Sequence, residues 1–367
     1  MTDSNTVAVL RLQRIPNIGD VTAKKLIAHC GSPAAIFEDK RQNLLKIDGI
    51  GVFTLTNLQD KRHLEEAESE FVYIKKNHIK VTYFMDADYP EYLRHCIDSP
   101  ILLFSKGKID LAHRKIISIV GTRNITSYGT AFCEQLIEDL APLNPIIVSG
   151  FAYGVDICVQ KAAIKHGLQT IGCLAHGLNQ IYPKVHLKYI PDVEKNGGFY
   201  TEFWSTSQPE RENFLKRNRI IAGMSEATIV IESAEKGGSL VTADIAHSYN
   251  RDVFAVPGRA EDKYSKGSND LIKQQKAHML TSAADLIYIL NWQLQDKKTK
   301  AIQKQLFIDL DETEQLLYSY LQTNGKQLLD TIALECKLPI FRISSTLLNM
   351  EMKGVIRPLP GKLFEAL

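Results

Sequence analysis

This sequence of 367 residues lacks a long apolar run, a signal peptide and paired cysteines. No stretch of about 18 apolar residues is present, so no membrane-spanning helix is expected. The first six residues, MTDSNT, lack the basic-then-apolar pattern of a secretory signal. The six cysteines are scattered without a C-x-x-C pair, which predicts reduced thiols and no metal site. We therefore expect a cytoplasmic protein that makes no membrane contact.

An excess of charge of one sign is also absent. The chain has 44 Lys and Arg against 42 Asp and Glu, for a net charge of +2. A nucleic-acid partner would therefore have to bind a local positive patch, because the chain as a whole carries little net charge. Hydrophobic residues make up 44% of the sequence, enough for a sizeable core, and the length allows two or three domains.

Five short apolar runs recur through the middle of the chain, and helical patterns separate most of them. Alternating strands and helices predict a Rossmann-like α/β fold, a mostly parallel sheet with helices on both faces. Ligands of such sheets bind beyond the carboxyl ends of the strands. The expected strands are residues 115–120, 145–150, 169–174, 227–232 and 252–257.

Gly121 and Arg123 follow the first of these runs and predict a phosphate site. Amides of a turn and of the next helix N-terminus can bind an anion, and an arginine adds a bidentate contact. The turn has neither G-x-G-x-x-G nor G-x-x-x-x-G-K-[ST] spacing. The second run ends in Ser149 and Gly150, with no acidic partner for a ribose. A dinucleotide cofactor and a P-loop are therefore disfavoured, and we predict no cofactor. Asp156, further along, could cap a helix or act in catalysis.

Phe214 precedes three cations within four positions, Lys216, Arg217 and Arg219. Aromatic rings that stack on bases, beside cations that neutralise phosphates, are typical of single-stranded nucleic-acid sites. A charged surface helix is the ordinary alternative, and Phe214 could instead be a hydrophobic staple. The stretch from Lys236 through Gly237, Gly238 and Ser239 predicts a second anion-binding helix start.

Seven motifs occur in order, and together they resemble the DNA-processing protein A (DprA, or Smf) family over roughly residues 89–290. In the one-letter code they are GxR…SYG from Gly121, SGxAxGxD from Ser149, YP at Tyr182, RNRIIAG from Arg217, GSLxTA from Gly238, AVPG from Ala255 and GxN from Gly267. Two positions depart from the family pattern: Leu215, where proline is frequent, and Lys276, where glycine is usual.

The resemblance implies a single-stranded DNA-binding recombination mediator that helps to load the RecA recombinase onto incoming DNA in natural transformation. It also implies a homodimer without catalytic turnover. The DNA-binding residues that follow from the motifs and turns together are Gly121, Arg123, Ser149, Gly150, Phe214, Lys216, Arg217, Asn218, Arg219, Lys236, Gly237, Gly238, Ser239 and Thr242.

A different function class stays open, a nucleotide-processing hydrolase similar to the LOG proteins. These carry P-G-G-x-G-T-x-x-E, and the segment from Gly237 to Thr242 lacks its third glycine and its glutamate. Asp244 is the nearest carboxylate. Because a hydrolase needs a carboxylate poised at the scissile bond and no convincing pair is present, we favour the mediator.

The remaining chain predicts flanking domains. Residues 1–70 form short helices with glycine turns at Gly19 and at Gly49 to Gly51; the second resembles a helix-hairpin-helix element, although plain αα-hairpin turns are our preferred alternative. Residues 71–290 form the extended Rossmann-like domain and 291–307 a polar linker. Residues 308–367 predict a winged-helix domain whose third helix has few cations, which favours protein contact or weak DNA binding.

Overall fold

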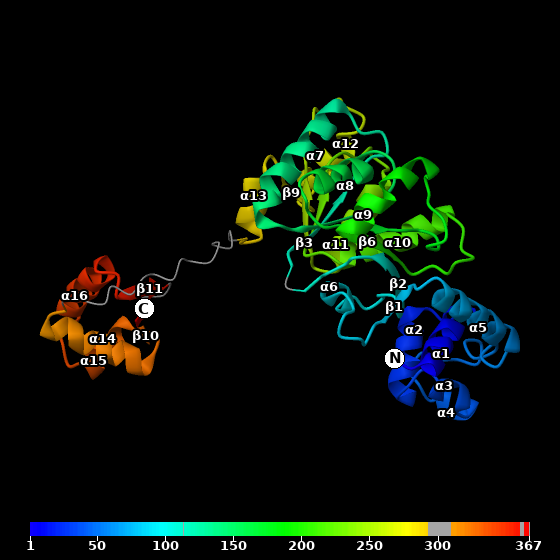
Figure 1. Cartoon of the computed structure of the whole chain (residues 1–367), viewed down its shortest axis with the longest axis horizontal. Helices are drawn as coiled ribbons and strands as arrows, with labels where there is room; N and C mark the ends of the chain where they lie inside the picture. The colour runs from blue at the N-terminus through cyan, green and yellow to red at the C-terminus, as the bar shows by residue number, and fades with distance from the viewer. Residues whose placement is uncertain (113, 293–309, 360–362, 367) are drawn as a thin grey trace. The chain divides into compact units, whose positions relative to one another are not determined.

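The computed structural model describes residues 1–112, 114–292, 310–359 and 363–366. The chain divides into two compact units, Met1–Leu294 and Gln295–Leu367 (Figure 1). The predicted linker at 291–307 lies almost wholly outside the described residues.

A nine-stranded sheet forms the centre of the first unit, in the order β1-β2-β6-β5-β4-β3-β7-β8-β9. Neighbours from β6 to β9 pair in parallel, whereas β1–β2 and β2–β6 pair antiparallel. The strands are β1 (Lys80–Tyr83), β2 (Leu102–Gly107), β3 (Ile116–Val120), β4 (Ile146–Ser149), β5 (Thr170–Cys173), β6 (Gly197–Thr201), β7 (Ala227–Val230), β8 (Asp252–Ala255) and β9 (His278–Met279).

Helices cover both faces of this sheet, which confirms the predicted Rossmann-like class (Figure 1). One face packs on α7 (Ser127–Leu140), α8 (Val155–Lys165) and α13 (Ala283–Ile289). The other packs on α6 (Glu91–Arg94), α10 (Arg211–Gly223), α11 (Gly238–Ser248) and α12 (Lys266–Lys273). The short helices η1 (Ala141–Leu143), η2 (Lys184–Tyr189) and α9 (Ile190–Lys195) complete the connections. Burial on both faces explains why the parallel strands are continuously apolar.

All five predicted parallel strands are present as β3, β4, β5, β7 and β8, but β6 was not predicted. Its sequence, GGFYT, begins with two glycines and has no apolar run, although all five residues are buried. Gly198 has to be small, because a Cβ there would lie 2.1 Å from the carbonyl oxygen of Lys106 in the adjacent β2. Close backbone approach, rather than apolar patterning, therefore determines this strand.

The N-terminal helices pack against the β1–β2 end of the sheet. They are α1 (Asp3–Arg14), α2 (Asp20–Cys30), α3 (Ala35–Glu38), α4 (Arg41–Leu44) and α5 (Lys61–Lys76). One apolar core joins them to Leu102, Phe104 and Trp204. After the turn at Gly49 and Gly51 the chain continues in successive turns until α5, without the regular helix of a helix-hairpin-helix element.

The second unit has its own small core. Its helices are α14 (Glu312–Asn324), α15 (Leu329–Glu335) and α16 (Ile340–Met352), and its strands are β10 (Gln327–Leu328), β11 (Ile356–Leu359) and β12 (Leu363–Ala366). The strands pair antiparallel in the order β10-β12-β11. Three helices with such a sheet are the predicted winged-helix arrangement.

Candidate single-stranded nucleic-acid site

A cavity of about 840 Å³ opens at the carboxyl ends of β3 and β7. These two strands are neighbours in the sheet. From β3 the chain continues to β4 and β5 on one side of the pair, and from β7 it continues to β8 and β9 on the other side. This is where ligands bind in doubly wound sheets. Ten of the fourteen predicted site residues line it: Gly121, Arg123, Phe214, Arg217, Asn218, Lys236, Gly237, Gly238, Ser239 and Thr242.

The turn after β3 does not offer the open amides that the sequence predicted. The carboxylate of Glu232, just beyond β7, accepts from the amide of Thr126 at 2.9 Å, and its backbone oxygen accepts from the amide of Thr122 at 2.7 Å. The Thr126 hydroxyl accepts from the amide of Gly129 at 3.1 Å and so caps α7. The start of α7 is therefore capped within the protein, and the exposed Arg123 is the cation that this turn offers to an anion.

The start of α11 differs, because no side chain of the described residues caps it. Gly237 stands at the N-cap position and has no side chain that could accept from the helix amides, and the Ser239 hydroxyl donates to the Ser233 hydroxyl at 2.9 Å. Lys236 lies exposed beside it at the cavity wall. An uncapped helix start carries partial positive charge, so this wall attracts a phosphate.

Phe214, in the first turn of α10, lies within reach of two guanidinium groups. The ring centre is 5.2 Å from Arg123 Cζ and 5.8 Å from Arg217 Cζ. The ring of Tyr182 meets it edge-on at 5.8 Å. Phe214 is only half-buried and lines the cavity, so it belongs to the site and not to the sheet core. These cation–π contacts hold the ring in place beside the two guanidinium groups.

Arg217 forms the floor of the cavity and is 4% exposed. Its Nη1 donates to the carbonyl oxygen of Gly150 at 2.7 Å and to that of Cys173, while its Nε has no partner among the described residues. Burial lowers the pKa of Arg217, and the negative charge of Asp156 opposes that shift. Burial raises the pKa of Asp156, which Arg217 in turn counteracts. Arg217 is thus tied to two strand ends and has little freedom to reach outward.

Gly150 is the position that permits this arrangement. A Cβ there would lie 2.5 Å from Asp156 Oδ2 and 2.7 Å from Arg217 Nη2. Gly150 and Ser149 do not line the cavity. The Ser149 hydroxyl donates to the carbonyl oxygen of Ile119 at 2.6 Å and is fully buried. Gly150 and Ser149 therefore lie behind the cavity wall, where they support the structure of the site without lining it.

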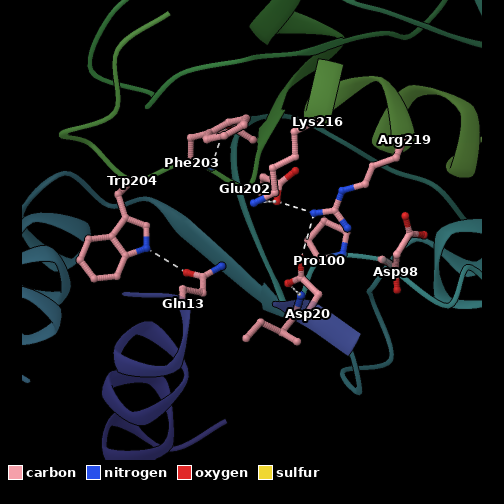
Figure 2. A network of polar contacts seen from close by, with 12 residues as sticks. Gln13, Asp20, Asp98, Pro100, Glu202, Phe203, Trp204, Lys216 and Arg219 are labelled. Carbon is pink, nitrogen blue, oxygen red and sulfur yellow. Dashed lines mark hydrogen bonds and ion pairs between the residues drawn. The ribbon is translucent and has the colours of Figure 1, made fainter. Parts of the chain in front are cut away.

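Arg219 and Lys216 lie away from the cavity, contrary to their predicted place beside Arg217. Arg219 Nη2 donates to Asp20 Oδ2 at 3.0 Å and to Glu202 Oε2 at 2.5 Å (Figure 2). Lys216 Nζ also pairs with Glu202 Oε2, at 3.0 Å. Although burial by itself lowers the pKa of Arg219, the charges of Glu202 and Asp20 raise it overall. Residues two positions apart on a helix point in different directions, so cations that are close together in the sequence need not lie together in the structure.

Of the three predicted arginines, Arg123 is the one that lies on a turn. Arg217 and Arg219 lie in the middle of α10 (Arg211–Gly223). Asn218, which lies between them, is 8% exposed, and its amide nitrogen lies 3.5 Å from the carbonyl oxygen of Gly238. Thr242 is buried at the cavity wall.

Several cavity residues were not predicted as part of the site. Asn124, Tyr153, Asp156 and Tyr182 all line it. Tyr182 comes from the loop after β5 and reaches Phe214 only through the tertiary fold, so spacing along the chain could not reveal it. Tyr153 and Asp156 follow the predicted Ser149–Gly150 strand end, and this position just after a strand was the signal from which they could have been predicted as site residues.

Asp244, the carboxylate that kept hydrolase chemistry open, does not line the cavity. It is exposed, and its Oδ1 lies 3.4 Å from Lys276 Nζ. Among the described residues there is no cluster of three or more His, Cys, Asp or Glu that could hold a metal, and no described helix is long and apolar enough to cross a bilayer.

Known proteins share this architecture. The DNA processing protein DprA of Bacillus subtilis is 40% identical over 199 residues, which cover 54% of this chain and 67% of that protein. The X-ray structure of DNA processing protein A from Streptococcus pneumoniae superimposes with a TM-score of 0.64 at 28% identity, covering 78% of this chain and 98% of that one. The protein of the same name from Helicobacter pylori, whose structure concerns its single-stranded DNA binding mode, gives a TM-score of 0.53 at 28% identity, over 58% of this chain and 95% of that one.

Family models account for both units. A model of the DprA winged helix domain matches residues 307–362. The model of DNA recombination-mediator protein A matches residues 80–291, which include all the residues that line the cavity. The chain therefore belongs to the DNA recombination-mediator protein A (DprA/Smf) family.

Proposed function

We propose that this chain binds single-stranded DNA in the cavity at the ends of β3 and β7. The observation that carries the proposal is the arrangement around Phe214, a half-exposed ring near the guanidinium groups of Arg123 and Arg217. The uncapped start of α11 and Lys236 lie in the same cavity. A stacking ring beside positive charge selects a single strand, because the bases of a duplex are already stacked.

We propose that the protein acts as a recombination mediator, which helps to load RecA onto incoming DNA in natural transformation. Membership of the DprA/Smf family supports this role. On the same basis we propose that it works in the cytoplasm, as a homodimer, and binds without catalytic turnover. RecA is then the expected protein partner.

The DNA site can be tested by the salt dependence of binding. A double variant, Arg123→Gln with Lys236→Gln, should weaken binding of a fluorescent dT20 oligonucleotide. Each phosphate contact contributes about 0.7 to the slope of log affinity against log salt for single strands, so the slope should become shallower by about 1.4. Lys216→Gln is the matched control, because Lys216 pairs with Glu202 outside the cavity. An unchanged slope in the folded double variant would contradict the assignment, and a hairpin duplex should bind more weakly than dT20.

The mediator role needs a separate measurement. The delay before RecA begins to hydrolyse ATP on single-stranded DNA reports nucleation of its filament. Substoichiometric amounts of this protein should shorten the delay, and the Arg123→Gln, Lys236→Gln variant should not. If the wild-type protein binds dT20 but leaves the delay unchanged, DNA binding stands and the mediator role is rejected.

A further inference from the structure

We propose that Glu70, on α5 of the N-terminal helices, is a positioning residue for the cavity at the strand ends. It holds the loop of residues 202–210, here called the β6–α10 loop, and through this loop the segments that carry Phe214 and Tyr182. The inference rests on the proposed binding of single strands, and it adds that the N-terminal helices regulate this site from outside the cavity.

Both carboxylate oxygens of Glu70 bind one residue of the β6–α10 loop. Oε1 accepts from the Ser205 amide at 2.8 Å, and Oε2 accepts from the Ser205 hydroxyl at 2.6 Å. Glu70 is 5% exposed, although the other glutamates of α5, Glu65, Glu66 and Glu68, are exposed. A buried carboxylate is tolerated where hydrogen bonds replace its water. The two bonds therefore fix Ser205 to α5.

The residue before Ser205 is anchored to α1. Trp204 Nε1 donates to Gln13 Oε1 at 2.8 Å, and Figure 2 shows the two side chains facing each other. Trp204 is buried in the apolar core of the N-terminal helices, and Arg14 Cζ lies 5.0 Å from the centre of its ring. Two successive residues of the β6–α10 loop thus depend on the N-terminal helices for their positions.

The β6–α10 loop in turn supports the segment that carries Tyr182. The carbonyl oxygen of Ser207 accepts from the Gly177 amide at 3.3 Å and from Gln180 Nε2 at 2.8 Å. Gly177 lies so close to the loop that a Cβ there would be 2.4 Å from the carbonyl oxygen of Trp204. Because two backbones packed so tightly transmit displacement to each other, a shift of the loop moves the segment that carries Tyr182.

The same loop leads into α10, which carries Phe214. Glu210, at the N-cap position of α10, makes no side-chain capping bond. Asn213 Nδ2 instead donates back to the carbonyl oxygen of Gln208 at 2.9 Å, so the first turn of α10 is held by the loop before it. Phe214 and Tyr182, whose rings meet edge-on at 5.8 Å, therefore both depend on the β6–α10 loop.

The ordinary alternative is that Glu70 only stabilises the fold. The half-buried ring of Phe214 and the exposed ring of Tyr182 favour positioning, since partial exposure leaves their places to the loops and not to a surrounding core. Binding groups whose supports are fixed lose less conformational freedom when a ligand binds. Removing Glu70 should therefore weaken DNA binding in protein that is still folded.

The test compares substitutions that keep or remove the two hydrogen bonds. Glu70→Ala removes both, whereas Glu70→Gln keeps an oxygen for the Ser205 amide and an amide group that donates to the Ser205 hydroxyl. Glu68→Ala is the matched control, because it deletes the same charge from an exposed position on the same helix. Binding of fluorescent dT20 to the full chain is measured at a temperature where melting curves show each variant to be folded.

Glu70→Ala should bind dT20 about tenfold more weakly than the wild-type chain, because two hydrogen bonds to a charged group are lost. Glu70→Gln and Glu68→Ala should stay within about twofold of wild type, because the first keeps both bonds and the second never made them.

Trp204 supplies a second readout that a purely stabilising role would not change. The chain has 2 tryptophans, so Trp292→Phe leaves Trp204 as the sole indole. In this background Glu70→Ala should move the Trp204 emission to longer wavelength, and saturating dT20 should move it back, because DNA binding and the order of the loop are coupled reciprocally. Trp204 does not line the cavity, so contact with DNA does not explain this return.

Normal dT20 affinity in folded Glu70→Ala, a loss of equal size in Glu70→Gln or Glu68→Ala, or a Trp204 emission that ignores dT20 would overturn the proposal. If Glu70→Ala does not fold, Ser205→Ala decides, because it loses one of the two bonds and should bind about threefold more weakly. Normal binding by Ser205→Ala would then reject the positioning role. A wild-type chain that binds no dT20 would refute the proposed function itself, whereas wild-type binding with unresponsive variants rejects only the role of Glu70.

Discussion

Arg217 and Arg219 are separated by one residue on α10, yet their guanidinium groups bind different parts of the protein. Arg217 donates to the strand-end carbonyl oxygens of Gly150 and Cys173 below the cavity. Arg219 donates to Glu202 and to Asp20, which is the first residue of α2 (Figure 2). The same helix thus builds the site with one side and anchors the N-terminal helices with another.

Replacing Arg219 should therefore affect stability and not DNA binding. Arg219→Ala leaves Glu202, which is 5% exposed, as a buried carboxylate paired only with Lys216. Breaking a buried ion pair by removing one partner costs about 3–5 kcal/mol. Urea denaturation should show a loss of this order, while the affinity of the folded fraction for dT20 stays within about twofold. Weakened binding at unchanged stability would return Arg219 to the DNA site.

Phe214→Ala should have the opposite result. A base stacked on this ring contributes about 1–3 kcal/mol, so binding of mixed-sequence single strands should weaken at least about tenfold. Because the ring is half-exposed and outside the sheet core, the melting temperature should change little. Phe214→Tyr keeps a stacking face and should retain most of the affinity. If Phe214→Ala lowered the melting temperature with affinity preserved, the ring would be a hydrophobic staple.

Gly150→Ala should disturb the cavity floor. The added methyl group would meet Asp156 Oδ2 at 2.5 Å and Arg217 Nη2 at 2.7 Å, so one of the two buried side chains must move. Overpacking of this kind costs about 1–3 kcal/mol. Gly51→Ala is the control, because a Cβ there meets no atom within 4 Å. We expect denaturation and dT20 titration to show losses only for Gly150→Ala; equal behaviour of the two variants would refute the tight packing.

Acid should destabilise the loop that carries Tyr182. The Tyr182 amide donates to His176 Nε2 at 3.3 Å, and His176 Nδ1 lies 2.9 Å from the carbonyl oxygen of Gly177. His176 therefore has to be neutral, and burial lowers its pKa below the ordinary value of about 6.5.

The unfolded chain binds a proton at His176 more readily than the folded chain does. The stabilisation is consequently complete above about pH 6.5 and is lost as the pH falls through the folded pKa. The free energy of unfolding should decrease between pH 7.5 and pH 5, with a shallower decrease in His176→Gln. Identical pH profiles for the two proteins would show that His176 does not contribute.

The sequence determined the parallel part of the sheet well, because strands buried on both faces, such as Ile116–Val120, carry an uninterrupted apolar signal. Strand β6 could not be predicted, because its glycines allow close backbone approach but give no apolar pattern. The site was predicted as a set of strand-end turns, and the cavity does gather most of them. The direction in which each side chain points could not be predicted. Arg217, Lys216 and Arg219 have different environments because they lie at different positions around one helix.

Glu232 provides a second example. The Gly121 turn has the composition of an anion site, but a carboxylate from the neighbouring β7 end already binds the amide and the hydroxyl of Thr126 at the start of α7. No local pattern could reveal this, since 106 residues separate Thr126 from Glu232. The open helix start at Gly237 and the filled one after Gly121 both follow a strand and a glycine, so local sequence does not show which of them is filled.

One edge of the large sheet is the very short strand β9, with two residues, whereas β1 at the other edge has four, as many as the interior strands β4, β5, β7 and β8. Edge strands expose unpaired amides and carbonyls that can template pairing with another chain, and shortness limits this hazard. At its β9 edge the nine-stranded sheet therefore offers few unpaired backbone groups with which another chain could pair.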